Sequence, residues 1–126
     1  MRKLSVVLFV FILLAGASRS QAQSLTHTAW KFYVEALHDT LTMHIGKDTS
    51  FSTSSSGEMI VRSAFSVVSD TIKIKDIDGQ YPCPDGEGVY RYTIDGDVMS
   101  FILVSDPCPN RSYALKDVKF KKTESK

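Results

Sequence analysis

Two cysteines, Cys83 and Cys108, are the side chains whose chemistry the sequence constrains most tightly. Two thiols allow a single intramolecular pairing, and thiols pair readily in an oxidising compartment. Because the thiolate is the nucleophile and the metal ligand, a paired cysteine offers neither role. We therefore expect a Cys83–Cys108 disulfide that is structural.

The three histidines, His27, His38 and His44, do not have the spacing of a metal site. Zinc ligands recur at short fixed spacings together with a further Cys or His, and we expect surface or turn positions instead. His44 alternates with Met43 on a predicted strand, so we keep it as a candidate ligand contact. Four acidic residues lie close together in the sequence but lack the twelve-residue pattern of a calcium loop. We interpret them as turn-forming residues, with weak calcium binding as the alternative. This cluster comprises Asp76, Asp78, Asp85 and Glu87.

No motif in the chain predicts catalysis. A serine nucleophile is expected in a recognisable turn such as G-x-S-x-G, which is absent, and the thiols are expected to be paired. The 15 basic and 14 acidic residues give a net charge of +1 without a concentrated basic face. Nucleic-acid binding needs such a face. We predict a protein that is not an enzyme, has no cofactor and binds no nucleic acid.

The first 22 residues have the three regions of a cleaved secretory signal. Basic Arg2 and Lys3 precede an apolar run, and small or polar residues lead to a cleavage site after Ala22. The apolar run is shorter than the roughly 20 residues of a membrane span, so we expect no transmembrane anchor. We predict a signal peptide over residues 1–22 and one secreted or periplasmic domain over residues 23–126.

Asp95-Gly96, between two β-rich runs, predicts a hairpin with a two-residue loop. In that register Ile94 pairs with Asp97, and extending the ladder brings Cys83 opposite Cys108. Their Cα atoms would then be about 4.5 Å apart, as in a non-hydrogen-bonded pair. Alternation predicts one buried face for the hairpin, formed by Tyr90, Tyr92, Ile94, Met99, Phe101 and Leu103.

Short β-rich segments recur along the rest of the chain, separated by turn signals. They predict eight or nine strands, over residues 30–36, 40–45, 49–53, 59–64, 65–69, 71–76, 88–94, 97–104 and 113–120. No segment keeps a helical period for three turns. We predict an all-β fold, and tight sequential hairpins favour a small antiparallel up-and-down barrel over a sandwich. The serine-rich residues 50–56 are interpreted as an exposed strand and loop.

The second half of the chain resembles exported bacterial lipocalin-like, or calycin-like, barrel domains. The resemblance lies in Gly88-Val-Tyr-Arg-Tyr, in Asp95-Gly-Asp and in the segment from Asp106 through Cys108 to Arg111. Lipocalins typically open with G-x-W, and here Thr28-Ala29-Trp30 lacks the glycine. The resemblance implies that Trp30 plugs one end of the barrel and that Arg111 packs across it, with a cation–π contact. Many such domains have no assigned activity, so the resemblance implies a fold more than a function.

Two functions stay open at this point. One is binding of a small apolar or amphipathic ligand, for which the expected contacts are Tyr90, Tyr92, Met99, Phe101 and His44. The other is a packed barrel whose loops contact a protein partner, as an inhibitor or a module of the cell envelope. In either case we expect a monomer.

Overall fold

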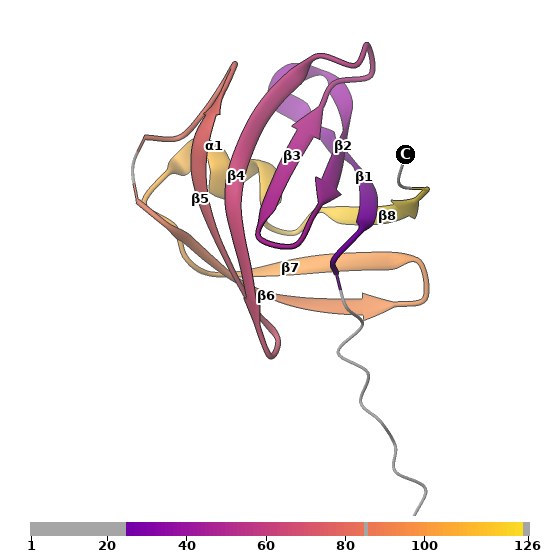
Figure 1. Cartoon of the computed structure of the whole chain (residues 1–126), viewed down its shortest axis with the longest axis vertical. Helices are drawn as coiled ribbons and strands as arrows, with labels where there is room; N and C mark the ends of the chain where they lie inside the picture. Colours follow the sequence, from indigo (N-terminus) through magenta and orange to yellow (C-terminus); the bar gives the residue numbers. More distant parts are fainter. Residues whose placement is uncertain (1–24, 85, 125–126) are drawn as a thin grey trace, which may run out of the picture.

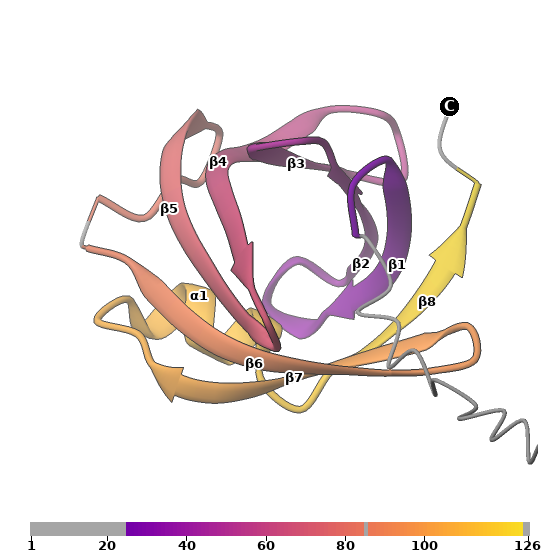
Figure 2. The same cartoon turned by 60° about the horizontal axis from the view of Figure 1, so that its bottom comes forward.

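The computed structural model describes residues 25–84 and 86–124. Over this part of the chain, eight antiparallel strands follow one another around a closed barrel, and β8 pairs with β1 to close it (Figure 1, Figure 2). The strands are β1 (Thr28–Val34), β2 (Asp39–Ile45), β3 (Thr49–Thr53), β4 (Met59–Val68), β5 (Thr71–Gly79), β6 (Gly88–Asp95), β7 (Val98–Ser105) and β8 (Lys119–Thr123). The predicted all-β barrel is confirmed, whereas the predicted signal peptide lies outside the described residues.

Two predicted strand assignments were wrong in their bounds. The two strands expected over residues 59–64 and 65–69 are one long strand, β4. The last strand, expected over residues 113–120, begins only at Lys119, because the two-turn helix α1 (Pro109–Leu115) takes up the start of that segment. Pro109 occupies the first helical turn, where its missing N–H costs nothing. A single-turn 3-10 helix, η1 (Glu35–Leu37), connects β1 to β2.

The register predicted for the β6–β7 hairpin was also wrong. Asp95 pairs with Val98, so the loop residues are Gly96 and Asp97 and not Asp95 and Gly96. Gly96 has φ +60° while Asp97 is not among the residues with positive φ. That combination is typical of a type II′ turn, which favours glycine at its first central position. The shift moves each partner by two residues, so every side chain stays on its predicted face.

Cys83 and Cys108 form a disulfide, as predicted, but their Cα atoms are further apart than the expected distance of about 4.5 Å. Both cysteines lie outside the β6–β7 ladder, and their Cα atoms are 6.2 Å apart. This distance lies within the range that a disulfide allows. The bond joins the loop before β6 to the residue that precedes α1, so it anchors the helix to the barrel.

The barrel interior has two regions of different character. Large side chains fill one region completely, and we call it the packed cluster; it consists of Trp30, Ile72, Tyr90, Met99, Phe101 and Phe120, each at most 1% exposed. The Phe101 and Phe120 rings lie 4.5 Å apart, and the Phe32 and Phe120 rings lie 4.9 Å apart. The second region is hollow and lies beside α1. Within the described residues, no helix has the length and apolar character needed to cross a membrane.

Candidate ligand-binding site

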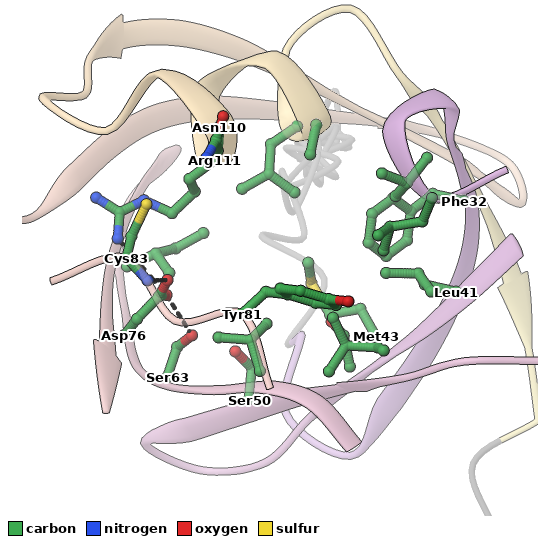
Figure 3. Close-up of a pocket in the computed structure, with 18 of the residues that line it drawn as sticks. Phe32, Leu41, Met43, Ser50, Ser63, Asp76, Tyr81, Cys83, Asn110 and Arg111 are labelled. Carbon is green, nitrogen blue, oxygen red and sulfur yellow. Dashed lines mark hydrogen bonds and ion pairs between the residues drawn. The ribbon is translucent and has the colours of Figure 1, made fainter. Parts of the chain in front are cut away.

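A cavity of about 280 Å³ lies inside the barrel, between the inner faces of β1 to β5 and helix α1 (Figure 3). Its walls are mostly apolar, with apolar side chains from four strands, β1, β2, β4 and β5, and from the helix. They include Phe32, Leu41, Met43, Ile60, Ile74 and Leu115. Tyr81, in the loop after β5, also lines the cavity and is 58% exposed. Because it meets both cavity and solvent, Tyr81 stands at the boundary between them.

A polar row crosses this apolar wall on three neighbouring strands. Ser50 on β3 pairs with Ser63 on β4, and Ser63 pairs with Asp76 on β5. Paired residues on adjacent strands point to the same side of the sheet, so all three side chains face the cavity. Ser52, two residues along β3, faces it as well. The three serines are at most 4% exposed, and the Asp76 side chain is 5% exposed.

The Asp76 carboxylate holds three neighbouring groups in place. Its Oδ1 accepts a hydrogen bond from Ser63 Oγ at 2.8 Å, and its Oδ2 accepts one from the backbone N–H of Cys83 at 2.7 Å. Arg111 Nη1 lies 3.5 Å from Asp76 Oδ1. Asp76 therefore links the wall of the cavity to the disulfide loop and to α1, as Figure 3 shows.

The hydroxyls of Ser50 and Ser52 are not engaged in the same way. Among residues 25–84 and 86–124, neither hydroxyl makes a side-chain hydrogen bond, although both residues are buried. Both residues line the cavity, so a molecule inside it can reach their hydroxyls. These two groups therefore favour any molecule in the cavity that can hydrogen-bond to them.

Arg111 on α1 joins the cavity to a buried carboxylate behind it. Its Nε and Nη2 donate to the two oxygens of Asp106, each at 2.8 Å, and Nη2 also donates to the carbonyl of Gly86 at 3.1 Å. The Arg111 and Asp106 side chains are 6% and 0% exposed. The hydrogen bonds to Asp106 raise the pKa of the guanidinium above its usual value. Arg111 is thus fixed and charged.

Asp106 receives two further hydrogen bonds. The phenol of Tyr90 donates to its Oδ2, and the backbone N–H of Cys108 donates to Oδ1 at 2.9 Å. Burial alone would raise the pKa of Asp106, but the hydrogen bonds from Arg111 and Tyr90 hold the pKa below its usual value. Burial, followed by the bond to Asp106, raises the pKa of Tyr90. Both groups therefore keep a fixed protonation state near neutral pH.

The expected ligand contacts do not line this cavity. Tyr90, Met99 and Phe101 belong to the packed cluster, and Tyr92 is 9% exposed on the same inner face. Their predicted burial is confirmed, whereas Leu103, predicted to be buried with them, is 38% exposed. The cavity lies in the other part of the barrel interior.

The remaining expected ligand contact lies on the barrel exterior. His44 alternates with buried Met43 and Ile45 on β2, so its ring points outwards. There it stacks on the ring of Phe51, with a centroid distance of 4.5 Å. Both rings belong to the outer wall of the barrel, away from the cavity lining.

Trp30 and Arg111 are both buried, as a structural role requires. Trp30 lies on β1 and its Nε1 donates to Thr28 Oγ1 at 2.9 Å. Arg111 lies on α1, with Asp106 and Asp76 as ion-pair partners. The cation–π contact implied by the family resemblance stays a prediction.

The sequence interpretation missed the polar wall because it took the serine-rich segment as exposed. Ser50 and Ser52 are buried and Phe51 between them is 38% exposed, the reverse of the usual arrangement. The alternation Ser-Phe-Ser is present in the sequence, but its polarity suggests that the serines face solvent and that Phe51 faces the core. Asp76 was noted as part of an acidic turn, and instead it lies at an inward position of β5.

Comparison of this chain with protein-family models, with curated protein sequences and with solved structures finds no match.

Proposed function

We propose that this protein is an exported, non-catalytic barrel of lipocalin-like type that binds a small amphipathic ligand. The observation that carries the proposal is the combination of an apolar cavity with two hydroxyls on its wall, those of Ser50 and Ser52, which make no side-chain hydrogen bond within the described residues. Ligand pockets are mostly apolar with a few polar groups that set orientation. The Cys83–Cys108 disulfide supports export, because such bonds persist in oxidising compartments.

The cavity volume limits the size of the ligand. A cavity of about 150 Å³ accommodates benzene, and this one is close to twice that volume at about 280 Å³. It therefore suits a molecule of roughly a dozen non-hydrogen atoms, such as an eight-carbon chain with a small polar group. Burial of such a chain contributes about 0.8 kcal/mol per methylene, and association costs at least about 4 kcal/mol. An eight-carbon chain therefore leaves about 2 kcal/mol, and two hydrogen bonds to the wall add about 2 kcal/mol, so we expect a dissociation constant of about 1 mM.

Titration calorimetry with 1-octanol tests the proposal when it includes a variant that fills the cavity. Ser52→Phe places a ring at an inward position of β3, so it should abolish octanol binding. Ser66→Phe is the matched control, because Ser66 is an exposed residue of the neighbouring strand β4. It should leave binding unchanged. Equal octanol binding by all three proteins would show that the cavity is not the binding site.

A second candidate function, protein contact, is favoured by the outer edge of β7. Among the described residues β8 pairs with Val98 to Ser100 only, while Ile102, Leu103 and Val104 are 54%, 38% and 55% exposed. Natural edge strands usually carry charges or proline that prevent pairing, and β7 has neither. An extended segment of a partner would add a strand at this edge.

For this second candidate function, the partner that we test is a second copy of the chain. The measurement is therefore self-association of the protein. If β7 pairs with a second copy, light scattering after size exclusion should show a dimer, in place of the monomer expected from the sequence, and Ile102→Lys should convert it to a monomer. The matched control Val67→Lys, on the exposed part of β4, should leave the dimer intact. A wild-type protein that is monomeric at high concentration would contradict self-pairing at β7.

A further inference from the structure

Among residues 25–84 and 86–124, the charges around the cavity do not balance. Asp76 and Arg111 both line it, and Arg111 is already held by the buried carboxylate of Asp106 with two hydrogen bonds. Two carboxylates therefore face one guanidinium, and the carboxylate nearer to the cavity is Asp76. The closer contact of Arg111 is with Asp106, at 2.8 Å against 3.5 Å for Asp76, so Asp106 compensates the Arg111 charge more closely than Asp76 does.

The hydroxyls on the cavity wall, like the Asp76 carboxylate, can accept hydrogen bonds from a ligand. Ser63 donates its only hydroxyl proton to Asp76, so it presents lone pairs to the cavity. Ser50 and Ser52 can donate or accept, and neither has a side-chain partner within the described parts of the chain. The polar end of a ligand at the β3–β5 part of the wall therefore meets one carboxylate and three hydroxyl oxygens, while Arg111, which also lines the cavity, already donates to Asp106. Such a surface is complementary to a hydrogen-bond donor.

Resting on the proposed ligand-binding function, we propose that the cavity selects amphiphiles whose polar end is a hydrogen-bond donor, namely a primary ammonium or a hydroxyl, and rejects fatty-acid anions. An ammonium has three donors and a positive charge, which suits Asp76 together with the Ser50 and Ser63 oxygens. A carboxylate has no donor, and it would be placed beside a carboxylate of the protein. Like charges brought together in a buried site are strongly unfavourable.

Three ligands of equal chain length separate polarity from size. The intact mature protein is titrated with octylamine, 1-octanol and octanoate at neutral pH by calorimetry. We expect octylamine and octanol to bind, and octanoate to bind at least tenfold more weakly than octylamine. Binding of octanoate as tight as that of octylamine would overturn the inference while leaving the ligand-binding function intact. Absence of binding by all three would refute the ligand-binding function itself.

Two variants test whether polar residues of the cavity wall cause this preference for hydrogen-bond donors. Ser50→Ala together with Ser52→Ala should weaken octanol binding about tenfold, since each neutral hydrogen bond contributes modestly. Ser66→Ala, on the exposed face of β4, is the matched control and should have no effect. Asp76→Asn should reduce the ratio of octylamine to octanoate affinity. An unchanged octanol affinity in the double variant would overturn the role of the hydroxyls, even if Asp76→Asn fails to fold.

Discussion

The Arg111–Asp106 pair should be the most sensitive polar contact of the fold, and Asp106→Asn tests it. The Asp106 side chain is fully buried and accepts hydrogen bonds from Arg111, Tyr90 and the N–H of Cys108. Asparagine keeps the shape but turns an N–H group towards the guanidinium and removes the negative charge. Removing one partner of a buried ion pair costs about 3–5 kcal/mol. Because small domains have about 5–15 kcal/mol of stability in total, this loss is large.

The matched control is Asp70→Asn on the barrel exterior. Asp70 also accepts hydrogen bonds from an arginine, Arg91, through Nε at 3.1 Å and Nη2 at 2.6 Å. The two side chains are 49% and 60% exposed, respectively, and exposed pairs contribute about 0–1 kcal/mol. Urea unfolding of both variants with the disulfide intact measures the difference. Equal losses for Asp106→Asn and Asp70→Asn would refute the argument that burial makes the first pair essential.

The same pair predicts how stability changes with pH. Hydrogen bonds lower the pKa of Asp106 in the folded state despite burial, while the unfolded chain keeps a value of about 3.9. The contribution of Asp106 is therefore present above about pH 4 and is lost as the pH falls through the lower folded pKa. The free energy of unfolding should decrease more steeply with acid in the wild type than in Asp106→Asn. Parallel acid dependence in the two proteins would contradict this assignment.

Three further perturbations address the scaffold. Replacing Cys83 and Cys108 by serine should cost about 3 kcal/mol through loss of loop closure, measured by urea unfolding against the oxidised wild type; no loss would show that the bond is dispensable. Phe101→Ala should cost about 3–5 kcal/mol yet leave octanol affinity unchanged in the folded protein, because Phe101 is buried outside the cavity lining. Gly88→Ala would place a Cβ 2.5 Å from Asp106 Oδ2, so thermal unfolding should show a loss of about 1–3 kcal/mol, and a stabilised variant would contradict this geometry.

Local pattern was sufficient for most of the strands and for the faces of the β6–β7 hairpin, but it divided β4 into two strands and missed α1. Alternation placed Tyr90, Tyr92, Met99 and Phe101 inside, and an even shift of register could not change that result. The sequence pattern was not sufficient for the register of the hairpin. The same Asp95-Gly96 pair fits a two-residue loop with glycine at its second position and one with glycine at its first position. The positive φ at Gly96 shows which loop the chain adopts.

The sequence by itself determined the all-β class and the identity of the disulfide partners, because these follow from short-range alternation and from having two cysteines. Its tight sequential hairpins favoured a closed barrel over a sandwich. Only the tertiary structure decided where the interior is filled and where it is hollow. Ser50, Ser63 and Asp76 come from three separate strands, and they form one row only through pairing between those strands. A polar residue at an inward position looks like a surface residue in the sequence, since the cavity that it faces is made by distant parts of the chain.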